Sequence, residues 1–172
     1  QNGLEKRFGW HTSAVGGEYT RFLTVFLPAL KEELANLVGL DHVWFHISDE
    51  PGDAEKESYA AARDSVASLL EGCRVMDALS SYAFYEEGLV KKPVVSEDHL
   101  EPFVEHGVKG LWTYYCTGQA LKVPNRFMAM PSTRNRILGT LLYKYDIEGF
   151  LHWGFNFYYS QYSLHPIDPF RV

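Results

Sequence analysis

Apolar positions along the chain follow two different periods. At residues 19–37 apolar side chains recur every three or four positions, which predicts a helix that is kinked or restarted at Pro28 and ends at Gly39. Beyond it, short runs rich in β-branched and aromatic residues alternate with further helical patterns. These runs predict strands at residues 42–47, 73–79, 92–96, 110–116 and 149–157.

Four shorter helical segments are predicted between these strands. Asp53 is expected to cap a helix over residues 54–71, which closes at Gly72, and a short helix or turn follows in residues 80–88. Ser96 is expected to cap a helix through Val104, and Ser132 a helix over residues 133–145. Residues 1–17, with four glycines and little periodicity, are interpreted as loop.

Regular alternation of strand and helix is typical of a parallel sheet with helices packed outside it. An open doubly wound sheet and part of a (β/α)₈ TIM barrel both fit, but no Gly-rich phosphate fingerprint follows any strand. In the first strand, Val43, Phe45 and Ile47 share the apolar face, and the opposite face becomes polar toward the carboxyl end. Barrel enzymes build their sites at that end, so we expect a partial TIM barrel of α/β class with five parallel strands in sequential order.

Composition narrows the function classes. The net charge of −6, without a long basic run, argues against nucleic acid and anionic membrane surfaces, and no apolar stretch reaches the length of a membrane span. Cys73 and Cys116, the two cysteines, are expected to be buried free thiols in apolar, strand-like runs. We expect neither a metal nor a cofactor. Cytoplasmic and secreted locations both remain open.

The first strand ends in two adjacent acids, Asp49 and Glu50, and Pro51-Gly52 then stops it. An acidic turn that leads into a helix cap would explain the pair without a function. A calcium loop that also uses Asp53 lacks the full ligand spacing. Because the pair lies where a barrel enzyme would place its active site, it is the leading candidate for catalysis.

Adjacent acids on one strand do not straddle a sugar as the carboxylate pair of most glycosidases does. The later strands 110–116 and 149–157 carry no acid at their carboxyl ends, and Glu148 lies at the opposite end of its strand. Glu97 and Asp98 are expected in the first turn of a helix, whereas Asp77 could face either side of its strand. The pattern therefore favours substrate-assisted hydrolysis, in which the 2-acetamido oxygen of the sugar replaces the protein nucleophile.

Four segments, "FHISDEP", "LWTYYCTGQ", "NRFMAMPSTRNRILGTLLYKY" and "GFLHWGFNFYYSQY", carry a resemblance over most of the chain. They resemble the catalytic domain of glycoside hydrolase family 123 and its relatives with domain of unknown function 4091. The resemblance implies a β-N-acetylgalactosaminidase with a (β/α)₈ barrel, usually preceded by a β-sandwich domain. It also implies that Asp49 orients the acetamido group and that Glu50 is the acid/base.

Under this resemblance, residues 1–172 are one domain, the barrel from its fourth strand on. The first three strands and any sandwich domain would lie outside it. We expect the isolated fragment to be inactive, and to self-associate or to need the missing segments. A non-catalytic glycan-binding or structural module on the same fold is the alternative interpretation.

Five further residues are candidates for contact with a carbohydrate substrate. Trp112 and Trp153 are suited to stack on a sugar or to fill the core, and Tyr114 alternates with Tyr115, so at most one of these two faces the site. His46 could bond a carboxylate or a sugar hydroxyl, or be a satisfied core histidine. Asn156 could bind a hydroxyl or form a turn.

Overall fold

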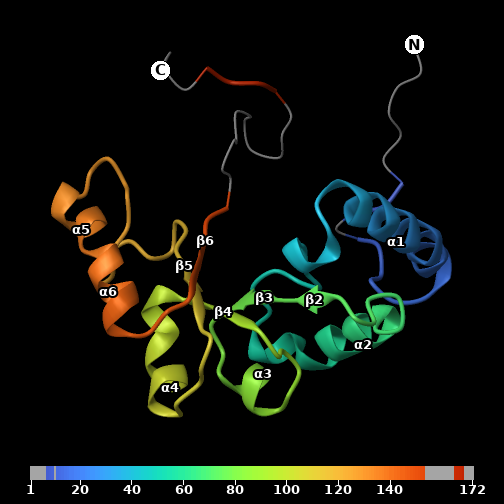
Figure 1. The fold of residues 1–172 in the computed structure, drawn as a ribbon, viewed down its shortest axis with the longest axis horizontal. Coiled ribbons are helices and arrows are strands. Elements are labelled where there is room, and N and C mark those ends of the chain that lie inside the picture. Colours follow the sequence, from blue (N-terminus) through green and yellow to red (C-terminus); the bar gives the residue numbers. More distant parts are fainter. Residues whose placement is uncertain (1–6, 10, 154–164, 169–172) are drawn as a thin grey trace.

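The computed structural model describes residues 7–9, 11–153 and 165–168, in which parallel strands alternate with helices (Figure 1). The first elements are α1 (Gly17–Leu37), η1 (Leu40–His42), β1 (Trp44–Phe45), η2 (Asp53–Glu55), α2 (Lys56–Val66), β2 (Arg74–Val75) and β3 (Asp77–Leu79). They are followed by α3 (Ala83–Glu86), β4 (Pro93–Ser96), η3 (Glu97–His99), α4 (Leu100–Glu105), β5 (Trp112–Tyr114), α5 (Ser132–Arg136), α6 (Leu138–Lys144) and β6 (Gly149–Leu151). This alternation confirms the predicted mixed α/β class.

The strands are paired in parallel and in sequence order. β1 pairs with β2, and β3, β4, β5 and β6 form a four-stranded sheet in that order. Only Met76 separates β2 from β3, so the predicted strand 73–79 is one segment whose pairing partner changes from β1 to β4. Within the described residues β6 does not pair with β1, and no barrel is closed.

Aromatic rings on β1 and β5 show that the strands form a curved surface. The ring centroids of Trp44 and Trp112 lie 5.7 Å apart. Two intervening strand positions separate β1 from β5, and neighbouring strands lie about 4.8 Å apart, so in a flat sheet the two rings would be roughly 14 Å apart. The face that carries these two rings is therefore concave, and we call it the inner face.

Apolar side chains fill both faces of the strands. On the outer face, between strands and helices, a buried cluster consists of Tyr59, Leu79, Phe84, Val90, Val95, Phe103 and Leu111. Ile47 packs against this cluster, as its parity in the sequence predicted. The inner cluster consists of Ala78, Val94 and Tyr114, with Met76, Trp112, Cys116 and Leu151 against it. Cys73 and Cys116 are both free thiols, as predicted, but they are half-buried and not fully buried.

Helix α1 continues through Pro28, so of the two predicted outcomes at this residue, a kink or a restart, the restart is wrong. A proline removes one backbone donor, and the carbonyl left without it is that of Thr24, four residues earlier. Thr24 is solvent-exposed, where water can bond the carbonyl. No helix in the described part of the chain is long and apolar enough to cross a membrane.

The predicted helix caps are also corrected. Gly52, not Asp53, precedes the first turn, and its backbone N–H donates to Glu55 Oε2 at 2.9 Å. Asp53 Oδ1 instead accepts a hydrogen bond from the Ser81 hydroxyl at 2.6 Å. Helix α2 ends at Val66 rather than residue 71. Residue preferences indicate which residues can cap a helix, but they do not fix the position at which the helix begins. Tertiary contacts decide that position.

The two predicted serine caps fail for similar reasons. Pro131 precedes α5, so Ser132 is already inside the helix. Ser96 does precede η3, but its side chain makes no capping bond. Its hydroxyl donates to Asp98 instead.

Candidate functional site

Glu50 is tied to two other strands at the carboxyl edge of the sheet. Its backbone N–H donates to the carbonyl of Ala78 in β3 at 3.0 Å. The hydroxyl of Tyr114, the last residue of β5, donates to Glu50 Oε1. Burial and the bond to Glu50 both raise the pKa of Tyr114, so its phenol remains protonated and acts as the donor. The carboxyl group therefore lies over the inner face.

The backbone at Glu50 adopts an unfavourable conformation. Its φ of 47° lies in the left-handed region, where a residue with a Cβ is destabilised by roughly 1–2 kcal/mol. The turn is held by the Glu50–Ala78 backbone bond and by Tyr114. Such conformations cluster at functional sites, where the surrounding structure imposes them.

Asp49 is exposed and lies near His46, whose pKa is raised above its ordinary value. The largest cause of the raised pKa is a hydrogen bond from the ring to Asp77, and the charges of Asp77 and Asp49 add to it. His46 Nδ1 and Asp77 Oδ1 are 2.9 Å apart. Of the alternatives open for His46, the structure shows the bond to a carboxylate.

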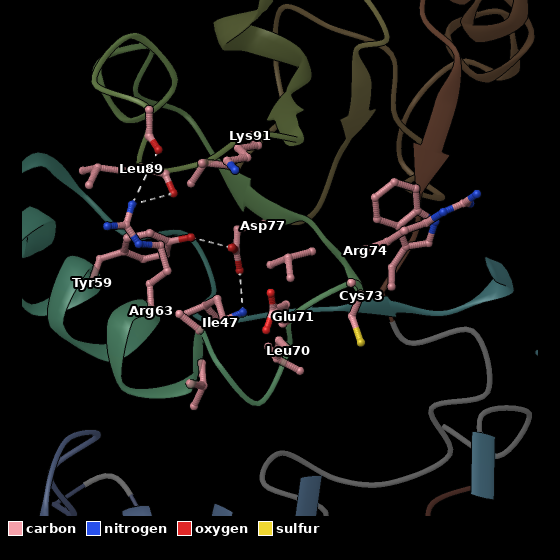
Figure 2. A pocket seen from close by; sticks show the side chains of 17 residues that line it. Ile47, Tyr59, Arg63, Leu70, Glu71, Cys73, Arg74, Asp77, Leu89 and Lys91 are labelled. Carbon is pink, nitrogen blue, oxygen red and sulfur yellow. Dashed lines mark hydrogen bonds between the residues drawn. The ribbon is translucent and has the colours of Figure 1, made fainter. Parts of the chain in front are cut away.

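Asp77 is the buried centre of this arrangement, with 1% of its surface exposed. Oδ1 accepts from the backbone N–H of Ile47 at 2.7 Å and of Ser48 at 3.0 Å, and Oδ2 accepts from the Tyr59 hydroxyl at 2.6 Å. Figure 2 shows Asp77 between Tyr59 and Ile47 in a cavity of about 540 Å³ beside α2. Asp77 therefore faces the helices.

Sequence reasoning left Asp77 undecided and missed Tyr59. The sequence did indicate an unusual role for Asp77, because it is the one charged residue among the otherwise apolar residues 75–79. A charged group in a buried strand must find several partners. The partner could not be identified from the sequence, because a tyrosine on an amphipathic helix is usually part of the core.

A second polar cluster stands at the carboxyl ends of β4 and β5. Gln119 Nε2 donates to Ser96 Oγ at 2.8 Å and to Asp98 Oδ1 at 3.2 Å, while Gln119 Oε1 accepts from the Cys116 backbone at 2.8 Å. Burial opposes ionisation of Asp98, but hydrogen bonds from Ser96, His99 and Gln119 outweigh it and lower the pKa. Asp98 is thus a fixed anion that anchors the loop after β5.

Glu97, its neighbour, has the opposite environment. Both carboxyl oxygens are buried without a hydrogen-bond partner among the described residues. Burial, with the charge of Asp98, raises the pKa of Glu97 to about 8. The side chain lines a cavity of about 700 Å³ between α4, α6 and the loop before α5, together with the outward-facing Thr113. Glu97 is therefore on the helix side, away from Glu50.

The other residues that were predicted to contact the sugar are Trp112, Trp153 and Asn156. Trp112 lies at the start of β5, beside Trp44 and against Gly149, where an added Cβ would come within 2.2 Å of the indole. It is therefore farther from the carboxyl edge than Tyr114. Trp153 follows β6 and is 50% exposed. Asn156 lies outside the described residues.

The acids of later strands are occupied elsewhere. Asp98 is held in its polar cluster, Glu97 faces the helices, and Glu148 lies before β6, 3.7 Å from Lys92. The described residues thus offer one adjacent carboxyl pair at the inner edge. Glu50 is positioned by a phenol, and Asp49 lies beside an imidazole. Such a pair can supply a proton donor and a fixed negative charge.

Comparison with known proteins gives one family. The family model described as "Glycoside hydrolase 123, catalytic domain" matches residues 1–172, the whole chain. No curated protein matches the chain.

Proposed function

This chain belongs to the glycoside hydrolase 123 catalytic-domain family, and we propose that it serves the retaining hydrolysis of β-linked 2-acetamido-2-deoxygalactosides by a substrate-assisted mechanism. Membership of a glycoside hydrolase family implies a carbohydrate substrate. The observation that carries the finer proposal is the adjacent pair Asp49–Glu50, with Glu50 held over the inner face by Tyr114.

We further propose that the strands are the fourth to the eighth of a (β/α)₈ barrel. Sequential parallel order and the 5.7 Å contact between Trp44 and Trp112 support this, because both are expected of a sheet that curls toward closure. The chain would need the preceding strands for activity. By itself it should self-associate, since α1 exposes Phe22, Val25 and Phe26. A light-scattering measurement of a stable monomer would contradict this.

Within the described part of residues 7–153, the acids of the later strands do not face Glu50, which supports substrate assistance. A retaining enzyme with a protein nucleophile needs two carboxyl groups about 5 Å apart on either side of the anomeric carbon. In the described residues 7–9 and 11–153, the acids on or beside the later strands lie in other surroundings: Asp98 in its polar cluster, Glu97 on the helix side and Glu148 near Lys92. The 2-acetamido oxygen can take the place of that nucleophile.

In the proposed first step the acetamido oxygen attacks the anomeric carbon, and the bond to the leaving oxygen breaks. Glu50 donates its proton to that oxygen, while Asp49 accepts a hydrogen bond from the acetamido N–H and stabilises the cationic ring. In the second step the Glu50 carboxylate takes a proton from water, which attacks the anomeric carbon and reopens the ring. The acetamido oxygen attacks the face opposite the leaving group, and water then attacks the face that the leaving group has left, so the two inversions together retain the configuration.

The proposed sugar contacts are those that the sequence suggested: His46, Trp112, Tyr114, Trp153 and Asn156. Tyr114 is supported best, because its hydroxyl already reaches Glu50. Trp112 is supported least, since its ring packs on Trp44 and Gly149.

The test compares two aryl β-glycosides in the full-length protein. We expect the 2-acetamido-2-deoxygalactoside to be cleaved with retention, as read from the first anomer seen by NMR. The plain galactoside should be nearly inert, because it lacks the internal nucleophile. Equal cleavage of both would rule out substrate assistance, and binding without cleavage of either would favour a glycan-binding module.

A further inference from the structure

The backbone ladder between β1 and its neighbour is interrupted just before the carboxyl pair. The Met76 N–H still donates to the Phe45 carbonyl at 3.0 Å, and the Glu50 N–H donates to the Ala78 carbonyl at 3.0 Å. Between these two bonds the amides of Ile47 and Ser48 donate to the Asp77 side chain. Between these two positions, the Asp77 carboxylate therefore takes the place of the backbone hydrogen bonds that would otherwise join the two segments.

Burial makes this replacement rigid. Asp77 is 1% exposed and Tyr59, its partner on α2, is 3% exposed. A buried carboxylate is stable only when hydrogen bonds replace its hydration, and here two amides, a phenol and an imidazole provide them. Moving the 46–50 segment would break several of these bonds together.

We propose that Asp77 is a positioning residue for the Asp49–Glu50 pair, acting through the amides of Ile47 and Ser48 and the ring of His46. This inference rests on the proposed function for the roles of the two acids. Asp77 does not touch the sugar, because it faces α2 and the cavity of Figure 2. It sets where the turn after β1 places Asp49 and Glu50.

The hydrogen bond between His46 and Asp77 also links Asp77 to Asp49, because the charge of Asp49 acts on the His46 ring. A carboxylate bonded to Nδ1 fixes the orientation of an imidazole and stabilises its charged form. The groups that act on His46 are Asp77, Asp49 and the Met76 carbonyl, all of which raise its pKa, against the opposing effect of burial. The ring is half exposed and lies near Asp49, so it can interact with that carboxylate when it is protonated.

Two substitutions of Asp77 separate positioning from a general loss of stability. Asp77→Ala removes every acceptor. Asp77→Asn keeps one oxygen for the Ile47 and Ser48 amides and can donate its amide to Tyr59, but it lacks the charge facing His46. We expect Asn to retain most of the activity that Ala loses. Tyr59→Phe, which removes one bond and keeps the ring, should fall between wild type and Ala.

The experiment uses the full-length protein and aryl 2-acetamido-β-galactosides whose leaving groups are 2,4-dinitrophenol, 4-nitrophenol and phenol. A misplaced Glu50 cannot protonate a poor leaving group, so Asp77→Ala should lower kcat for the phenyl substrate by about 10²-fold. The dinitrophenyl substrate, which needs little acid assistance, should be affected much less. Glu97→Gln, which changes a buried carboxyl on the helix side, is the matched control and should leave all three rates unchanged.

Hydrogen exchange gives a readout that needs no substrate. In Asp77→Ala the amides of Ile47 and Ser48 should exchange on the order of tenfold faster, the equivalent of one lost hydrogen bond. The amides of Val94 and Val95 in β4 should not change. In Asp77→Asn the two amides should stay protected, while the NMR titration of His46 moves to lower pH.

Three results would contradict either the positioning role of Asp77 or the proposed function, and they distinguish between the two. Unchanged exchange at Ile47 and Ser48 in Asp77→Ala overturns the inference. An equal loss of kcat for all three leaving groups overturns the claim that Asp77 positions the acid Glu50, because a displaced Glu50 would slow the poorest leaving group most. Wild-type protein inactive on every substrate would overturn the proposed function, whereas the exchange data would still decide whether Asp77 holds the segment.

Discussion

The Tyr114 hydroxyl donates a hydrogen bond to Glu50 Oε1 and so joins the end of β5 to the turn after β1. The two residues are 64 positions apart in the chain, and the strands beside them, β1 and β5, are not neighbours in either sheet. Only a curved sheet lets the side chain of one such strand reach the other. The same curvature that places this contact also creates a concave surface on which a sugar can lie over the carboxyl pair.

Replacement of Glu50 by Gln should remove the proposed proton donor while keeping its shape. We expect kcat to fall about 10²–10⁴-fold, most for poor leaving groups. The measurement is the rate on a series of aryl glycosides, with Glu57→Gln on the exposed surface of α2 as control. Undiminished activity in Glu50→Gln would show that another residue is the acid.

Asp49→Asn should weaken catalysis in a different way. The cationic ring intermediate would lose the charge that faces it, and a loss of about 10²–10³-fold is expected for such a stabilising group. The loss should be similar for good and poor leaving groups, because Asp49 does not donate the proton. Calorimetric titration with the sugar product should show that binding persists. A loss that rises with leaving-group pKa would assign the acid role to Asp49 instead.

Tyr114→Phe removes the donor to Glu50 and keeps the ring on the inner face. A hydrogen bond to a charged group contributes about 1.5–3 kcal/mol, so kcat/KM should fall by roughly 10–10²-fold. Tyr115→Phe is the matched control, because Tyr115 faces the other side and packs on Phe150 with ring centroids 4.9 Å apart. Equal losses in both variants would mean that Tyr114 acts only by packing.

Glu97→Gln should stabilise the protein at neutral and alkaline pH. Folding raises the pKa of Glu97 from 4.5 to about 8, so the folded state binds a proton that the unfolded state has already lost. The wild-type protein therefore loses stability, relative to the variant, as the pH rises from 4.5 to 8, and the two should be equally stable at pH 4. Denaturation midpoints at pH 4, 6 and 8 check this. A constant difference across that range would contradict it.

Much of the fold was determined by local sequence patterns. Periods of two and of 3.6 residues distinguish strand from helix without reference to the rest of the chain. The order of the elements then restricts the topology to parallel strands with outer helices, as observed. The same local logic located Asp49 and Glu50 at a strand end, because Pro51-Gly52 marks the stop.

The tertiary structure alone decided the partners of these residues. Asp77 could have faced either side of its strand, and only the packing of α2 brought the Tyr59 hydroxyl within 2.6 Å of it. The contact of Tyr114 with Glu50 likewise depends on the register and curvature of four strands. Hydrogen bonds between distant residues require the backbone to be in place first, and no local pattern encodes that distance.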